Sequence, residues 1–197
     1  MFSDGVVELF ESGVVTGEAK SLHKGKIISS FVLGSKKTFD FLDNNPFVEF
    51  HPTEYVNNPY VISQNARMIA INSALEIDLT GQASAESLGR VFYSGIGGQA
   101  DFMRGAVMAP GGKTILTLPS TAEGGEVSRI LPLIREGAGV TLNRGDVHYV
   151  ASDCGEVPTP CYTGVQEALD AAHQGDVIKI AAGIYTGVSV QPRKDYT

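Results

Sequence analysis

The sequence has few basic residues, little cysteine and no long apolar run, and each shortage excludes a class of protein. Lysine plus arginine is 15 against 22 acidic residues, which gives a net charge of −7. Nucleic-acid binding needs clustered basic side chains on the phosphates, so we expect no nucleic-acid partner. No apolar run approaches the roughly 20 residues that cross a bilayer, so we expect no membrane partner.

The scarcity of cysteine and histidine argues against a metal site. The two cysteines, Cys154 and Cys161, have no pair of histidines near them, and the four histidines are scattered along the chain. Metal ligands usually recur at short, characteristic spacings, which this sequence does not show. The sequence therefore predicts no metal.

The first residues also lack a targeting signal. Met1 is followed by Phe-Ser-Asp-Gly, without the basic and apolar regions of a secretory signal peptide. We therefore expect a cytoplasmic protein. Hydrophobic residues make up 43% and charged residues 19% of the chain, which is typical of a packed core. A length of 197 residues suits one domain, or one domain plus a fragment.

Glycine, in contrast, is abundant. It makes up 23 of the 197 residues, about 12%, against a usual share of roughly 7%. The excess peaks at Ser94-Gly-Ile-Gly-Gly-Gln-Ala-Asp-Phe102. Backbone N–H groups of successive glycines can face a ligand, and a helix predicted over 99–107 would add its positive end. Such a segment suits a phosphate, a carboxylate or an oxyanion. A tight turn between a strand and a helix explains the same pattern.

Helix-like and strand-like patterns alternate over residues 1–150, which favours an α/β domain. A short helix begins at Ser3 or Asp4, and another covers 37–42. The pattern predicts strands over 26–33, 68–79, 114–118, 127–131 and 147–150. Of these, 68–79 is the longest.

The composition changes after residue 151. Residues 153–161 contain both cysteines and two prolines and read as a linker. A helix and two short apolar strands follow over 162–197. This tail is too small to bury a core of its own.

Four segments together resemble the acetyl-CoA hydrolase/CoA-transferase family. They are Met1-Phe-Ser-Asp-Gly-Val-Val-Glu-Leu9, Glu49-Phe-His-Pro-Thr-Glu-Tyr-Val-Asn-Asn-Pro59 with 69–73, the glycine segment 94–102, and 113–132. The resemblance implies that residues 1–152 are the C-terminal catalytic half of such an enzyme, truncated at both ends. It also implies a CoA-transferase-like mixed sheet with flanking helices.

The resemblance implies covalent catalysis on an acyl-CoA and a short-chain carboxylate, with coenzyme A as a substrate. A glutamate attacks the thioester and is converted through an anhydride to a glutamyl-CoA thioester, while backbone N–H groups stabilise the oxyanion. The N–H donors correspond to Gly98 and its neighbour Gly97. The substrate-binding positions correspond to Asn57, Gly95, Gln99 and Asp153. Locally, Asn57 also reads as a turn residue before Pro59.

Three departures from the family pattern predict that the chain alone is inactive. The nucleophilic glutamate of the family precedes the position of Met1, so it is absent from this sequence. Asp153 stands where the family has a glutamate, and the tail takes the place of the last helices of the family. Three other carboxylates lie near matching segments: Glu49, Glu54 and Glu76. Glu76 falls in an apolar strand, where burial raises a carboxyl pKa, although an edge position or a salt bridge explains it more simply. His51, before a proline, reads as a turn residue rather than a general base.

The tail over 162–197 resembles the capping helix and first rung of a right-handed parallel β-helix of the pectate-lyase-like type. One rung cannot bury the core of a solenoid. Three functions stay open from the sequence: a CoA-transferase, an acyl-CoA hydrolase, and a non-catalytic half-domain. The last would self-associate or pair with a separately encoded N-terminal half.

Overall fold

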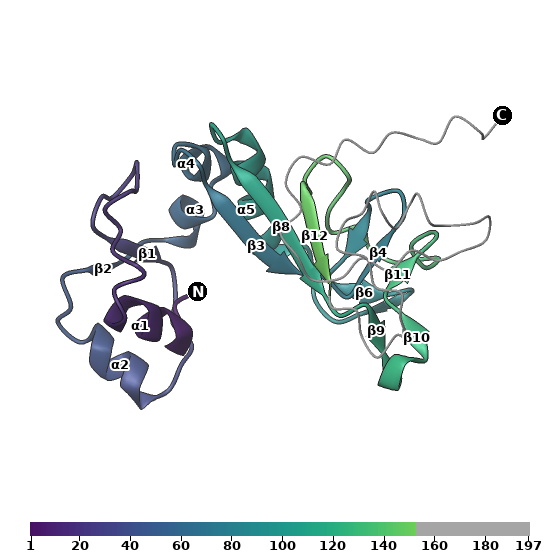
Figure 1. Ribbon diagram of the computed structural model, residues 1–197, viewed down its shortest axis with the longest axis horizontal. Helices are drawn as coiled ribbons and strands as arrows, with labels where there is room; N and C mark the ends of the chain where they lie inside the picture. Colours follow the sequence, from purple (N-terminus) through teal and green to yellow (C-terminus); the bar gives the residue numbers. More distant parts are fainter. Residues whose placement is uncertain (153–197) are drawn as a thin grey trace. The chain divides into compact units, whose positions relative to one another are not determined.

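Short strands and short helices alternate along residues 1–152, the part of the chain that the computed structural model describes. Figure 1 shows these elements, coloured in chain order. They divide into two compact units. Of the described residues, the first unit holds Met1–Ala70 and Asp101–Lys113, and the second holds Ile71–Ala100 and 114–152. The predicted α/β class is confirmed. The linker predicted over 153–161 and the tail predicted over 162–197 lie outside the described residues.

The N-terminal elements are α1 (Asp4–Glu11), β1 (Ile27–Ser29), α2 (Lys36–Leu42), β2 (Val48–Phe50), α3 (Thr53–Val56) and α4 (Pro59–Ser63). They are followed by β3 (Ile69–Ser73), β4 (Glu76–Asp78), β5 (Ala83–Ser84), β6 (Ser87–Leu88), β7 (Val91–Phe92) and α5 (Gly97–Met108). The last described elements are β8 (Lys113–Leu118), β9 (Thr121–Ala122), the 3-10 helix η1 (Glu123–Gly125), β10 (Val127–Ser128), β11 (Ile130–Leu131) and β12 (Tyr149–Ser152).

The first unit contains a parallel strand pair, β1 with β2, and α2 lies between them in the chain. The strand predicted over 26–33 ends early, at Ser29. The residues that follow it pair with the N-terminus instead. The Phe2 N–H donates to the Phe31 carbonyl at 2.8 Å, and the Leu33 N–H donates to the Phe2 carbonyl at 3.0 Å. A long-range backbone partner therefore replaces the local strand pattern.

Asp4 joins the two N-terminal helices. The helix predicted after Ser3 is present, but the Ser3 side chain forms no capping bond. The Asp4 carboxylate instead accepts hydrogen bonds from the N–H and hydroxyl of Ser35, both at 2.9 Å, and from the hydroxyl of Thr38. The bond from Thr38, followed by those from Ser35, holds the pKa of Asp4 below its usual range. Asp4 thus stabilises the first turn of α2, for which Ser35 is the N-cap residue.

In the first unit, α5 approaches α4 closely at Gly105. A Cβ atom added there would lie 2.6 Å from Cβ of Ile62 and 3.1 Å from the carbonyl oxygen of Pro59. Ile62 is the buried residue of α4. Only glycine permits this separation, because 2.6 Å is far inside van der Waals contact between carbon atoms.

In the second unit, β8 is the central strand of a three-stranded sheet with the order β12-β8-β3. Every second residue of β8 is buried, namely Thr114, Leu116 and Leu118, as expected for a strand with one face on the core. β12 runs parallel to β8. The strands predicted over 114–118 and 147–150 are confirmed, the second with bounds shifted by two residues.

The single long strand predicted over 68–79 is wrong. The chain changes partner at residues 74 and 75, where the Ala74 N–H donates to the Thr117 carbonyl at 3.0 Å and the Leu75 N–H donates to the Ser84 carbonyl at 2.8 Å. β3 therefore belongs to the β12-β8-β3 sheet, and β4 is the middle strand of a second sheet, β11-β4-β5.

A similar change divides the strand predicted over 127–131 into β10 and β11. At the junction, the Arg129 N–H donates to the Ser120 carbonyl, and the Arg129 carbonyl accepts from Ile77, each at 2.9 Å. β10 pairs with β9 in an antiparallel hairpin, whereas β11 pairs with β4 in parallel. The two short sheets thus meet at one residue.

Asp78, at the end of β4, accepts hydrogen bonds from several backbone N–H groups around it. Its carboxylate accepts from the Thr80 N–H at 2.8 Å, the Thr80 hydroxyl at 2.7 Å, the Gln82 N–H at 3.1 Å and the Ile134 N–H at 3.0 Å. Burial by itself raises the pKa of Asp78, but the bonds from Thr80, Ile134 and Gln82 outweigh it, so the pKa lies below its usual value.

Among residues 1–152, no helix is long and apolar enough to cross a bilayer.

We expect Gly105→Ala to lower the free energy of unfolding by about 1–3 kcal/mol, because the added methyl group overlaps Ile62. The loss should be smaller in an Ile62→Ala background, where the space is open, so the two changes should couple. Urea denaturation of the wild type, the two single variants and the double variant measures this coupling. Gly5→Ala is the matched control, because nothing lies within 4 Å of a Cβ atom there. Equal losses in both backgrounds would contradict the close approach.

We expect Asp78→Asn to make the free energy of unfolding depend less on pH in the acidic range. The pKa of Asp78 is lower in the folded than in the unfolded state, so its stabilisation is complete above roughly pH 4 and is lost as the pH falls through the folded pKa. At pH 7 the variant should be less stable by about 1–3 kcal/mol, because an amide replaces a charged acceptor of several bonds. Urea midpoints at pH 7, 5, 4 and 3 should converge toward low pH. A constant difference would contradict the argument.

Candidate functional site

The glycine segment leads directly into α5. The helix predicted over 99–107 is confirmed and begins earlier, at Gly97, so that Gly97 and Gly98 form its first turn. Gly97 has a φ of +61°, a conformation that glycine adopts at little cost. The first N–H groups of a helix have no partner within the helix and carry its positive end. The segment therefore offers N–H donors to an anion, and Gly95 and Gly97 are exposed to solvent while Gly98 is partly exposed.

Gly95 is a glycine that the fold itself does not require. Its φ is not in the left-handed region, and no atom lies within 4 Å of an added Cβ. An alanine fits here, in contrast to Gly105. The absence of a side chain at Gly95 therefore matches a ligand that approaches the backbone.

Gln99 anchors the start of α5 to the neighbouring strand. Its side-chain Nε2 donates to the carbonyl of Ser73, the last residue of β3, at 3.1 Å. This bond gives Gln99 a positioning role in the structure. Its predicted contact with substrate remains a prediction.

Asn57 lies at the end of α3 in the first unit, partly buried, and its N–H donates to the Thr53 carbonyl at 2.8 Å. The capping role beside Pro59 belongs to the next residue, Asn58, whose side chain accepts from the Tyr60 N–H at 2.9 Å. The turn reading thus describes the side chain of Asn58 better than that of Asn57. Asp153, the remaining predicted substrate-binding residue, lies outside the described residues.

Of the three carboxylates considered as substitutes for the nucleophile, Glu76 is fully buried. Its Oε2 forms an ion pair with Nε of Arg135 at 3.1 Å, and its Oε1 accepts from the Arg135 N–H at 3.4 Å. The salt-bridge explanation is therefore confirmed. The edge explanation is wrong, because β4 lies between β11 and β5. Burial and pairing make Glu76 a structural charge.

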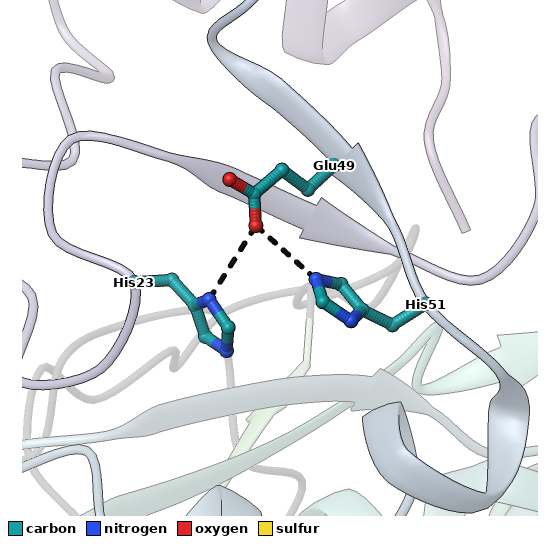
Figure 2. Close-up of side chains that lie close together, drawn as sticks. All are labelled: His23, Glu49 and His51. Carbon is teal, nitrogen blue, oxygen red and sulfur yellow. Dashed lines mark hydrogen bonds and ion pairs between the residues drawn. The ribbon is translucent and has the colours of Figure 1, made fainter.

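Glu49 lies between two histidines (Figure 2). Its Oε2 is 3.2 Å from Nε2 of His51 and 3.5 Å from Nδ1 of His23, while its Oε1 is 3.6 Å from Nζ of Lys26. The hydrogen bond with His51 lowers the pKa of Glu49; partial burial opposes this shift, and the charges of Lys26 and the histidines add to it. Glu54, on α3, is exposed.

We call His23, Glu49 and His51 the histidine cluster. The spacing of the histidines along the chain did not predict this cluster. The Glu49-x-His51 spacing in an extended segment was the available signal, since residues two apart in a strand share a face. His51 continues the strand pairing, as its N–H donates to the Ser29 carbonyl at 2.9 Å.

A cleft of about 570 Å³ opens in the first unit. Its wall is formed by the segment 14–23, by α3 and α4, by residues 65–69 and by Phe102. His23 and Tyr55 belong to this wall. The histidine cluster thus borders a space that admits solvent.

With this geometry in view, comparison with known proteins gives the family. The model of the acetyl-CoA hydrolase/transferase C-terminal domain matches residues 34–179, which is well over half of the chain. The chain belongs to the acetyl-CoA hydrolase/transferase family. The match reaches past the domain limits predicted at 152 and 161, so these limits and the β-helix-like tail remain predictions.

Curated relatives of the chain are CoA-transferases. It is 51% identical over 155 residues to the 4-hydroxybutyrate coenzyme A transferase of Clostridium kluyveri, covering 79% of this chain and 36% of the relative. It is 43% identical over 170 residues to the succinyl-CoA:cyclohexane-1-carboxylate CoA transferase of Geobacter metallireducens, covering 86% and 39%. The chain therefore spans little more than a third of the length of these relatives.

Solved structures of other proteins match the fold of the chain. RipA from Yersinia pestis superposes with a TM-score of 0.71 at 41% identity, over 76% of this chain and 34% of RipA. The 4-hydroxybutyrate CoA-transferase from Porphyromonas gingivalis gives 0.66 at 42% identity, over 79% and 35%. The CoA-transferase-like fold that the resemblance implied is thus confirmed for the described residues.

We expect Arg135→Met to lower the free energy of unfolding by roughly 3 kcal/mol, because it leaves the charge of Glu76 buried without a cation. A second change, Glu76→Gln, should restore part of the loss by removing that charge. Thermal and urea unfolding measure both. Arg90→Met is the control: its partner Glu136 and Arg90 itself are largely exposed, and such pairs contribute at most about 1 kcal/mol. Equal effects of the two arginine variants would contradict the structural role of Glu76.

Proposed function

We propose that the chain supplies the substrate-binding and oxyanion-stabilising part of a CoA-transferase. The main support for this proposal is the exposed glycine segment at the start of α5. In this segment the fold has room for a side chain at Gly95, so packing does not explain the glycine. The family membership and the names of the relatives support the same reading. The substrates proposed are an acyl-CoA thioester and a short-chain carboxylate, in a cytoplasmic enzyme.

The reaction proceeds by two exchanges at a glutamate. One carboxylate oxygen of the glutamate attacks the thioester carbon, the C–S bond breaks, and CoA leaves as a thiolate with an acyl-glutamyl anhydride behind it. The thiolate then attacks the glutamyl carbonyl of the anhydride, releases the first carboxylate and forms a glutamyl-CoA thioester. The same steps in reverse, with the second carboxylate, transfer CoA and regenerate the glutamate.

Each exchange passes through a tetrahedral intermediate whose oxygen carries negative charge. The N–H of Gly98, with that of Gly97 beside it, is the proposed donor to this oxygen, because helix N–H groups placed before the reaction need no reorganisation. Gly95 leaves room for the thioester to reach these donors. Gln99 holds the segment through its bond to Ser73, and Asn57 and Asp153 are the proposed contacts for the carboxylate substrate.

The test uses a chimera, because the chain spans little more than a third of the length of its relatives. Residues 1–152 replace the matching stretch of the Clostridium kluyveri relative, which supplies the rest of the enzyme. We expect CoA transfer from acetyl-CoA to 4-hydroxybutyrate, and Gly95→Ala should lower kcat/KM about 10- to 100-fold, because an added methyl group displaces the thioester from its donors.

Gly124→Ala in the same chimera is the control, with the same chemical change at an exposed position outside the glycine segment and the N-terminal motif, where a Cβ is also unobstructed. The positive φ of Gly124 makes this change costly for local stability but not for the approach of a substrate. The control should leave kcat/KM unchanged. Full activity of the Gly95→Ala chimera would contradict the proposed approach of the thioester. Release of free CoA without transfer to the carboxylate would identify an acyl-CoA hydrolase instead, and CoA binding without turnover would favour the non-catalytic half-domain.

A further inference from the structure

The histidine cluster brings together three side chains from two distant stretches of the first unit (Figure 2). His23 comes from the segment between α1 and β1, and Glu49 and His51 come from β2 and the residue that follows it. Because Glu49 and His51 are two residues apart in extended backbone, they project to the same side. His23 faces them from the other chain segment.

The distances from Glu49 to the two histidines match the separations between ligands of one ion. Around a tetrahedral Zn²⁺ with bonds near 2.1 Å, neighbouring ligand atoms lie about 3.4 Å apart. Here Oε2 of Glu49 lies 3.2 Å from Nε2 of His51 and 3.5 Å from Nδ1 of His23. One ligand atom from each of the three residues lies within 4.8 Å of the others. Small side-chain movements suffice to bring all three onto one centre.

Neighbouring groups support two of the three ligands, His23 and Glu49, in this role. The Tyr55 hydroxyl lies 2.8 Å from Nε2 of His23, so the other ring nitrogen of His23 faces Glu49. Such a bond to the second nitrogen is the usual support of a metal-bound histidine. Lys26 lies 3.6 Å from Oε1 of Glu49 and donates to the Pro46 carbonyl at 2.5 Å. It thereby leaves Oε2 as the ligand oxygen.

We propose that His23, Glu49 and His51 bind one divalent transition-metal ion of the Zn²⁺ type through Nδ1, Oε2 and Nε2. Two imidazoles and a carboxylate suit a borderline cation, whereas Mg²⁺ and Ca²⁺ prefer oxygen ligands alone. The three side chains are partly exposed, which leaves a fourth position for water. The ion would join the segment 20–26 to β2 at the border of the cleft.

This proposal departs from the sequence analysis, which predicted no metal. A simple ion-pair network is the competing explanation: both imidazoles would donate to Glu49, and a metal ion would find no affinity above that of an exposed carboxylate. The two explanations differ in what happens when the ion is added to the full chain.

The first experiment titrates the chelator-stripped 197-residue protein with Co²⁺, followed by its visible absorption, and with Zn²⁺, followed by calorimetry. We expect one ion per chain, with Co²⁺ bands of low coordination number that Zn²⁺ abolishes. Glu49→Gln should weaken binding by more than about 100-fold, since loss of a mere supporting group costs about 10- to 100-fold. Tyr55→Phe should weaken it by about 10-fold.

Glu54→Gln is the matched control, because it removes an exposed carboxylate from the adjacent helix α3 with the same change of charge. It should leave the affinity unchanged. Equal binding by the wild type and Glu49→Gln would overturn the proposal, as would the absence of Co²⁺ bands and of heat on adding Zn²⁺. Circular dichroism of the metal-free variants shows whether they fold.

A second measurement needs no variant. Nitrogen-15 NMR of the histidine rings distinguishes the two ring nitrogens, so Zn²⁺ should shift one imidazole through Nδ1 and another through Nε2. This mixed pattern follows from the different nitrogens that His23 and His51 direct at Glu49. Shifts confined to other histidines, or to Nε2 atoms alone, would overturn the proposed ligand set.

Discussion

The hydrogen bond from the side chain of Gln99 to the carbonyl of Ser73 is the constraint on which the glycine segment depends. A run of exposed glycines has more conformational freedom than any other sequence and offers no side chains to hold it. Here the side-chain bond of Gln99, two residues after α5 begins, restricts the conformations of the segment. Ser73 is itself fixed, because the next residue, Ala74, and its neighbour Asn72 both bond to Thr117 in β8. The glycine segment is therefore held through a chain of bonds to a buried strand, as preorganised donors require.

Much of this arrangement was predictable from local sequence. The sequence around the glycine pattern predicted the helix that follows it, because helix-forming and helix-starting residues act within a few positions, whereas the donor role of the glycines remains a prediction. The chain's changes of partner were not predictable in this way. At Ala74 and Leu75, and again at Arg129, the backbone bonds to carbonyls in a different sheet. An apolar run of uniform character contains no mark of that change, so one strand was predicted where two exist.

The buried charges show a similar limit. Glu76 in an apolar strand left an edge position and a salt bridge open, and the salt bridge is the one present, since an unpaired carboxylate is costly to bury. The partner, Arg135, lies 59 residues further along the chain, and nothing local identifies it. The histidine cluster lies between these cases. Glu49 and His51 share a face by strand alternation alone, whereas His23 reaches them only through the fold.

The two sites proposed for this chain make opposite chemical demands, which keeps them separable. In its proposed role, the glycine segment uses N–H donors and a helix end to stabilise negative charge. In its proposed role, the histidine cluster uses lone pairs of two imidazoles and a carboxylate to stabilise a cation. A cation on the cluster cannot replace an N–H donor to a thioester oxyanion, and a methyl group at Gly95 removes no metal ligand. Loss of one property with retention of the other would therefore identify which group of residues carries each function.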